Sequence, residues 1–142
     1  MKIAIGSDHA GFNYKQEIVI YLKAGGHEVH DMGTNSEDPV SYVPFIQSVA
    51  RAVVTGEADR GIVLGGSGNG EAMAANRLRG VRCGLCWNTE SARLTRLHND
   101  ANILSLGQRM MDLSTALQIA DVFLTTPFEG GRHLARINQL DE

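Results

Sequence analysis

Hydrophobic residues follow two alternating patterns along this chain. Short apolar runs, which are typical of strands buried in a sheet, are separated by longer stretches whose apolar residues recur every three or four positions, as on one helical face. Between Phe12 and Ala24, for example, Ile18, Val19 and Leu22 share such a face before the glycine pair at 25–26 ends it. The pattern predicts five strands, at residues 2–7, 27–32, 59–64, 81–87 and 101–106, and helices at 12–24, 42–56, 72–78, 89–98, from 113 onward and at about 131–140.

Strands that alternate with helices predict a parallel sheet covered on both faces. We expect an α/β, three-layer, Rossmann-like fold: a single domain over residues 1–142, with a five-stranded sheet in the flavodoxin-like order 2-1-3-4-5 and a C-terminal helical tail. In such sheets, ligands bind outside the carboxyl ends of the strands, between strands 1 and 3. The loops after those strands, at residues 7–11 and 65–71, should therefore meet at one crevice.

The second of these loops has the composition of an anion-binding turn. It has the sequence G-G-S-G-N-G-E over residues 65–71 and leads from an apolar strand into a helix. Glycines allow positive φ angles and close approach of backbone amides to an anion, and a helix N-terminus adds unpaired N–H groups. Glu71 would repel a bound phosphate, but a carboxylate beside an oxyanion hole suits removal of a proton from carbon. The loop thus indicates enolate chemistry, with Glu71 ionised at the helix N-terminus as the base.

Other polar residues lie near predicted strand ends. Asp8 and His9 leave the first strand together, although Asp8 could simply cap the next helix and leave His9 in solvent. His98 and Asn99 precede the fifth strand, where they could belong to an ordinary turn, and Arg109 follows that strand. These groups are candidates for proton transfer and substrate contact.

The tail carries a basic face. Arg132 and Arg136 are one helical turn apart, with His133 beside them. Two guanidiniums and an imidazole suit a phosphate dianion, which arginine binds through paired hydrogen bonds. The same residues could form a solvated face that pairs with Glu129 or Asp141. A phosphate site, a base and an oxyanion hole together indicate a phosphorylated sugar that undergoes proton transfer.

The composition narrows the function classes. The 142 residues are 43% hydrophobic and 20% charged, as in ordinary globular proteins, and the formal net charge of −3 argues against a nucleic acid partner. No apolar run reaches the roughly 18–20 residues of a membrane span, and the N-terminus does not resemble a signal peptide, so we expect a cytoplasmic protein with no membrane partner. Cys83 and Cys86 have a C-x-x-C spacing, but on one strand they would point to opposite faces, and no further zinc ligands follow a known spacing. We expect neither a metal nor a cofactor.

Five segments together resemble the type B ribose-5-phosphate isomerases, in the family that also includes galactose-6-phosphate isomerase subunits. They are I-G-S-D-H-A-G-F, G-G-S-G-N-G-E-A-M-A-A-N, H-N-D-A-N, G-Q-R-M and G-G-R-H-L-A-R, and the resemblance runs essentially from end to end. It implies interconversion of ribose 5-phosphate and ribulose 5-phosphate through a cis-enediolate, without metal or cofactor, as in the pentose phosphate pathway. It also implies a homodimer with active sites that draw on both subunits, alone or within a tetramer.

The resemblance also assigns roles to single residues. Glu71 matches the base that moves a proton between C2 and C1, whereas another branch of the family uses a cysteine at the position of Gly65. Asp8 and His98 match the pair that opens the furanose ring. Five loop residues match the oxyanion hole for the enediolate: Gly66, Ser67, Gly68, Asn69 and Gly70. Asn99 matches a contact to a substrate hydroxyl, and Arg109 matches a further substrate contact. The phosphate ligands are matched by His9, Arg132 and Arg136.

One segment departs from the resemblance: many members have D-Y-P where this chain has S-Y-V at residues 41–43, so the path of that loop is open. The assignments require Glu71 to face the same pit as His9 and His98, with the tail arginines about a sugar's length away.

Three alternatives stay open. An isomerase of a six-carbon sugar phosphate, such as allose or galactose 6-phosphate, would need a longer reach from Glu71 to Arg132 and Arg136. A non-catalytic phosphate- or nucleotide-binding module is a second, although the loop lacks the Lys-Ser/Thr ending of a Walker A motif. A DNA-binding role for the tail arginines is a third, and it lacks a continuous basic surface.

Overall fold

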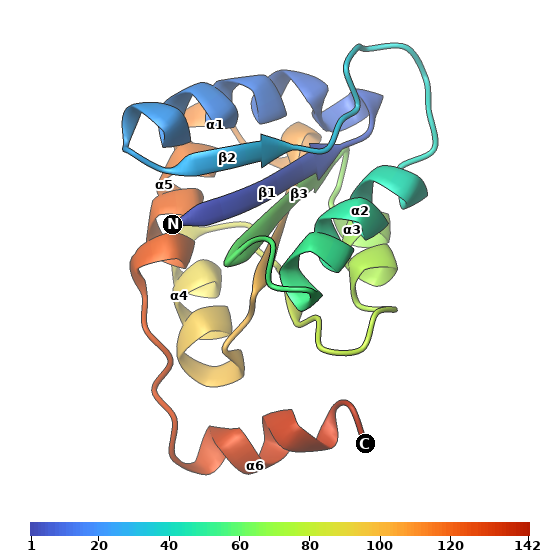
Figure 1. Ribbon diagram of the computed structural model, residues 1–142. Coiled ribbons are helices and arrows are strands. Elements are labelled where there is room, and N and C mark those ends of the chain that lie inside the picture. The colour runs from blue at the N-terminus through green and yellow to red at the C-terminus, as the bar shows by residue number, and fades with distance from the viewer.

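In the computed structural model, which describes residues 1–142, five parallel strands form one sheet with helices on both faces (Figure 1). The strands are β1 (Lys2–Ser7), β2 (Glu28–Asp31), β3 (Arg60–Gly65), β4 (Cys83–Leu85) and β5 (Ile103–Gly107). The helices are α1 (Phe12–Ala24), α2 (Val43–Val54), α3 (Asn69–Ala75), α4 (Thr89–Asn99), α5 (Leu113–Thr125) and α6 (Arg132–Gln139), with short 3₁₀ turns at His9–Gly11 and Gln108–Met110. None of these helices combines the length and the apolar character that a bilayer crossing demands.

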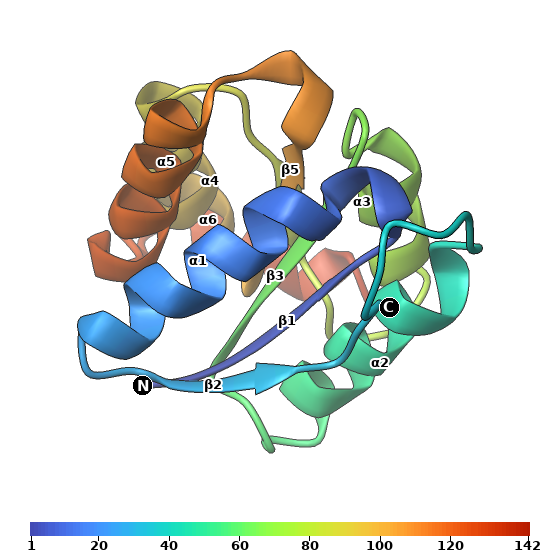
Figure 2. The same cartoon turned by 90° about the horizontal axis from the view of Figure 1, so that it is seen from above.

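Side chains of the central strands alternate between two hydrophobic cores, as the pleated backbone requires. Ile3 and Ile5 of β1 point into one core, and Ala4 between them points into the other. Helices α1, α4 and α5 cover the first face, and α2 and α3 cover the second, which gives the layers seen from above in Figure 2. The predicted three-layer α/β class is confirmed.

The order of the last two strands was predicted wrongly. The sheet runs β2-β1-β3-β5-β4, so β5 lies between β3 and β4. Burial explains these places, because every residue of β5 is buried, as suits a central parallel strand, whereas the three residues of β4 are half-buried, as suits an edge. The register pairs Leu64 with Leu106 and Gly65 with Gly107. The carboxyl end of β5 therefore lies beside that of β3, where the glycine loop begins.

Strand β4 is shorter than predicted, whereas helix α3 keeps its predicted length but begins and ends three residues earlier. One side chain explains where α3 ends and where β4 begins. Asn76 ends α3 at Ala75 and exchanges two hydrogen bonds with the backbone of Cys83: its Nδ2 donates to the carbonyl at 3.0 Å, and its Oδ1 accepts from the amide at 2.8 Å. The segment between them is thereby held as a turn, with Gly80 at a φ of 90°. Strand β4 begins only at Cys83.

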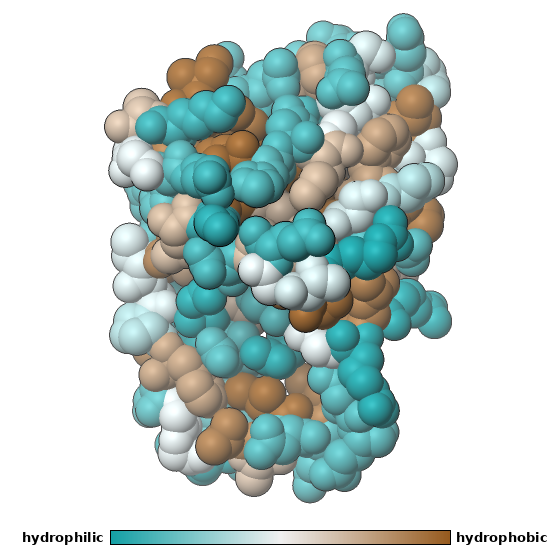
Figure 3. Space-filling model, viewed as in Figure 1, coloured by the Kyte–Doolittle hydropathy of each residue, from teal (hydrophilic) through white to brown (hydrophobic).

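Helix α6 lies outside the three layers. It follows an extended segment and packs against α4, at the bottom of Figure 1. Leu134 on α6 and Leu140, which follows it, are 50% and 64% exposed, and Figure 3 shows hydrophobic surface in this region of the molecule. One chain therefore leaves apolar side chains of its tail uncovered.

Candidate active site

A cavity of about 450 Å³ opens where β1, β3 and β5 end. The two loops that were expected to meet at the crevice both line it, together with the turn after β5. Its lining residues are Asp8, His9, Ala10, Tyr42, Gly66, Ser67, Gly70, Glu71, Arg109 and Met110.

The glycine loop is fixed from β5 and leaves amides free. Gly68, which has a φ of 84°, accepts a hydrogen bond at its carbonyl from the buried Ser105 Oγ at 2.7 Å. The carbonyl of Gly66 accepts from the amide of Arg109 at 3.0 Å. The amides of Gly66 and Ser67 donate to no acceptor within the chain. They are therefore available to an oxygen of a ligand, as an oxyanion hole requires.

Glu71 lies in the first turn of α3 and is only 4% exposed. Its carboxylate fills the space beside Gly65, because a Cβ at residue 65 would lie 1.7 Å from Glu71 Oε1. Burial raises the pKa of Glu71; a hydrogen bond from its own amide opposes this, and the negative charge of Asp8 raises the pKa further. The sequence suggested that the helix N-terminus would set the pKa of Glu71, but burial has the larger effect. A carboxyl group with a raised pKa is better matched to general-base catalysis near neutral pH.

Asp8 and His9 are both ordered by the backbone. Asp8 Oδ1 accepts from the amides of Ala10 at 2.9 Å and Gly11 at 3.2 Å, so it does cap the following turn, while Oδ2 has no partner in the chain. His9 Nδ1 accepts from the amide of Val40 at 3.1 Å. In the neutral imidazole the proton therefore sits on Nε2, which makes that nitrogen a donor to a ligand.

Arg109 and Tyr42 pack against glycines of the loop. A Cβ at Gly66 would lie 2.9 Å from an Nη atom of Arg109, and a Cβ at Gly70 would lie 2.6 Å from the Tyr42 hydroxyl. The sequence predicted the position of Arg109, whereas it placed Tyr42 only at the start of the helix expected over residues 42–56. Only its place in the S-Y-V segment pointed to the site.

The other predicted site residues lie elsewhere in the chain. His98, Asn99 and Arg136 line a second cavity of about 300 Å³ between the end of α4 and α6. Asn99 ends α4 just before β5 begins, so this cavity lies at the amino end of the sheet, whereas Glu71 lies at the carboxyl end. The expectation that Glu71, His9 and His98 share one pit is thus not met within a single chain. Arg132 lines neither cavity, and Gly68 and Asn69 support the loop without lining the first one.

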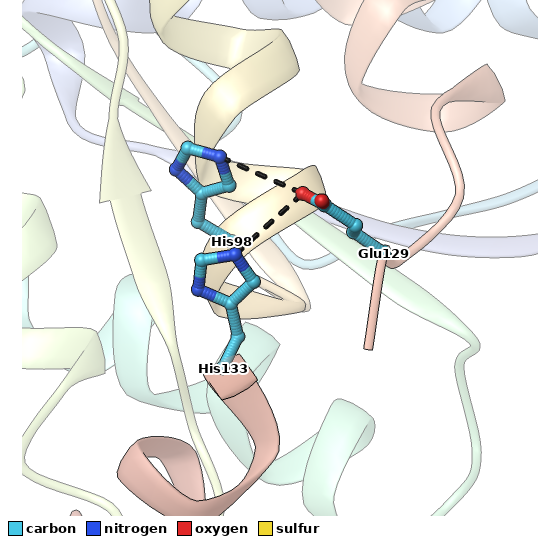
Figure 4. A group of neighbouring side chains, drawn as sticks. All are labelled: His98, Glu129 and His133. Atoms are coloured by element: carbon cyan, nitrogen blue, oxygen red, sulfur yellow. Dashed lines mark ion pairs between the residues drawn. The ribbon is translucent and has the colours of Figure 1, made fainter. Parts of the chain in front are cut away.

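His98 and His133, which line the second cavity, form a cluster with Glu129 (Figure 4). The sequence offered only the pairing of His133 with Glu129 and did not bring His98 to it. His98 Nε2 lies 3.7 Å and His133 Nε2 lies 3.5 Å from the same oxygen of Glu129, and the two imidazole rings stack with centroids 4.5 Å apart. The amide of Glu129 donates to the carbonyl of Leu97 at 3.0 Å, which fixes Glu129 beside His98.

The tail arginines have no acidic partner. The alternative of pairing with Glu129 or Asp141 holds for His133, which lies 3.5 Å from Glu129, but it is wrong for the arginines, because Glu129 faces the two histidines and Asp141 accepts from the amide of Gly80 at 3.0 Å. Neither Arg132 nor Arg136 makes an ion pair within the chain. Both guanidiniums are free to bind an anion.

The two cysteines are free thiols on or next to β4. Burial raises the pKa of Cys83 far above its ordinary value and that of Cys86 to about 11. Thiols held protonated at neutral pH are poor nucleophiles and metal ligands. These surroundings agree with the interpretation that the two cysteines belong to a strand and do not form a redox or metal site.

Known proteins resemble this chain over its whole length. A family model described as Ribose/Galactose Isomerase matches residues 3–140. The chain is 45% identical to ribose-5-phosphate isomerase B of Mycobacterium leprae, over 100% of this chain and 89% of that relative, and 44% identical to the Escherichia coli K12 protein of the same name, over 98% and 93%. The solved structure of ribose-5-phosphate isomerase B from Clostridium thermocellum matches with a TM-score of 0.98 at 50% identity, covering 99% of this chain and 95% of that one.

Proposed function

The chain belongs to the ribose/galactose isomerase family, and we propose that it interconverts ribose 5-phosphate and ribulose 5-phosphate. Membership makes the chain an isomerase, which sets aside the non-catalytic binding module and the DNA-binding role. The observation that carries the proposal is the position of Glu71: a buried carboxylate beside a loop in which the amides of Gly66 and Ser67 have no partner. Its relatives named ribose-5-phosphate isomerase B support the choice of a pentose phosphate.

Glu71 and the glycine loop carry out the proton transfer between C2 and C1. Glu71 removes the proton from C2 of the open-chain aldose, and negative charge develops on the carbonyl oxygen at C1. The free amides of the loop and the Ser67 hydroxyl stabilise this cis-enediolate. Glu71 then returns the proton to C1, and a proton passes from the C2 hydroxyl to O1, which leaves the ketone at C2.

The remaining steps need groups from both cavities. Asp8, with its free Oδ2, and His98 open the furanose ring, Asn99 binds a hydroxyl, and His9, Arg132 and Arg136 bind the phosphate. Since one chain places these groups at opposite ends of the sheet, we infer that a second copy of the chain brings its His98 and arginines to each Glu71 cavity. The unpaired guanidiniums support this homodimer, as do exposed apolar side chains such as Met73 and Trp87, both 64% exposed, and Leu140.

The change Glu71→Gln tests the base. The amide keeps the shape of the side chain but cannot accept the proton, so kcat should fall on the order of 1,000-fold while the KM for ribose 5-phosphate changes little. The exposed Glu57 provides the control, since Glu57→Gln should leave both constants unchanged. Residual turnover within about tenfold of the wild type would refute the assignment.

Substrate class is tested separately by comparing kcat/KM for ribose 5-phosphate and allose 6-phosphate. A higher value for the pentose is expected. A preference for the hexose would replace the substrate and leave the role of Glu71 intact.

A further inference from the structure

We propose that His98, Glu129 and His133 form a binding site for a zinc ion, and that zinc bound there inhibits the enzyme. These three side chains come from the last turn of α4, from the segment before α6 and from the first turn of α6, and they converge in Figure 4. These residues follow no known metal-binding spacing in the sequence, and only folding brings them together.

The distances suit a small divalent ion. The two imidazole nitrogens and the carboxylate oxygen all lie within 4.8 Å of one another, with nitrogen–oxygen separations of 3.5 and 3.7 Å. Tetrahedral zinc with bonds of 2.0–2.2 Å separates its ligand atoms by about 3.4 Å. The imidazole planes lie at 19° to each other, so each ring would have to turn about its Cβ–Cγ bond to direct its nitrogen at the ion.

His133 supplies an independent reason to expect a ligand. The residue is only 7% exposed, and its Nε2 is buried without a hydrogen-bond partner, although the nearest oxygen of Glu129 lies 3.5 Å away. A buried polar atom without a partner is costly, and coordination to a metal would satisfy it. The side chains of His98 and Glu129 are 39% and 49% exposed, which leaves an entry path and a fourth position for water.

Charge and ligand type favour zinc over magnesium, at moderate affinity. Imidazole nitrogen is a good ligand for zinc and a poor one for magnesium, which prefers oxygen. The carboxyl end of α4 carries partial negative charge near His98, whereas Arg136, which lines the same cavity, repels a cation. With three protein ligands and this opposing charge, binding should be weaker than at a four-ligand structural site.

Inhibition, unlike binding, rests on the proposed function. There His98 transfers a proton during ring opening, and a ring nitrogen bound to zinc can do neither half of that transfer. Zinc would also hold His133 and Glu129 at the edge of the cavity that Arg136 lines, where the phosphate is proposed to bind.

Calorimetric titration of the full-length, metal-free protein with zinc chloride tests the site. We expect one ion per chain and no heat from magnesium chloride. Glu129→Gln removes one ligand from an exposed position without a packing change, and it should weaken zinc binding at least about tenfold; His133→Gln should do the same. The surface pair of His30 and Glu28, whose atoms lie 3.1 Å apart, provides a matched control, since His30→Gln should bind zinc as the wild type does.

Equal zinc affinity in the wild type and in Glu129→Gln would overturn the site, as would the absence of any zinc binding to the wild type below about 1 mM. Inhibition by zinc should weaken in parallel with binding across the variants. Zinc that binds through these residues without slowing isomerisation would instead count against the role given to His98 and would leave the site standing.

Discussion

At the scale of single residues, the protein keeps its candidate base in a place that costs stability. Burial raises the pKa of Glu71 above its ordinary value of 4.5, so the folded state favours the protonated carboxyl more than the unfolded state does. Above the raised pKa, the charged carboxylate therefore lowers the free energy of unfolding. This loss disappears as the pH falls below the pKa that Glu71 has in the unfolded chain.

Glu71→Gln should consequently stabilise the protein at pH 8, and the gain should shrink as the pH approaches 4. Urea denaturation at several pH values measures the difference. The rate constant kcat/KM of the wild type should fall on the acid side as the base takes up its proton. If the glutamine variant were less stable than the wild type across the whole range, the carboxylate would be stabilised by its surroundings, and the burial argument would fail.

A second residue-scale prediction concerns Gly65. Any Cβ at this position would overlap the carboxylate of Glu71, so Gly65→Ala must displace the base. A misplacement of about 1 Å costs on the order of 100-fold in rate, and we expect a loss of that size in kcat. Gly25→Ala provides the control, because a Cβ there meets nothing closer than 3.4 Å and lies far from the site. Wild-type rates in Gly65→Ala would show that catalysis does not need the carboxylate where it lies.

The same overlap gives a steric reason for the two branches that the family resemblance implies. A cysteine at residue 65 and a glutamate at residue 71 would compete for one volume beside the loop. A chain can therefore place a base there from one position or from the other.

At the scale of elements, the site depends on β5 lying next to β3. Ser105 on β5 reaches across to the carbonyl of Gly68, and this bond is buried. In Ser105→Ala the carbonyl loses its partner, which should cost about 1–3 kcal/mol of stability and loosen the loop. The kcat should fall more than the affinity for substrate, because the loop amides are proposed to act mainly on the enediolate.

Stability by chemical denaturation and binding of a hydroxamate mimic of the enediolate would check this prediction. The exposed Ser114 on α5 offers a matched control. Unchanged mimic binding in Ser105→Ala would mean that the loop holds its shape without β5.

The helices and strands themselves were largely predictable from the sequence, whereas which of them lie side by side was not. The helix at 12–24 matches α1 residue for residue, since its glycine stop and apolar spacing are local signals. The places of β4 and β5 depend on which strand buries more surface, and this is decided by packing between distant segments. Asp8, His9, Arg109 and the glycine loop were brought together by a rule for strand ends. Contacts such as that between Glu129 and His98 follow no such rule.

At the scale of the whole molecule, the groups proposed to carry out isomerisation are divided between two ends of one sheet. The cavity at the carboxyl ends has the candidate base, the free amides and His9, and the cavity beside α6 has His98 and the unpaired Arg136. A symmetric dimer in which the α6 end of each copy covers the Glu71 cavity of the other would unite them and would bury the exposed leucines of α6.

Mixing two inactive variants tests this central claim most directly. Glu71→Gln and His98→Asn each disable every site in their own homodimers. After denaturation and refolding of an equal mixture, half of the dimers are mixed, and in each of these one site combines the intact Glu71 of one chain with the intact His98 of the other. Shared sites therefore predict recovery of about a quarter of wild-type activity. No recovery, in a mixture shown to contain mixed dimers, would mean that each active site is built within a single chain and would contradict the account.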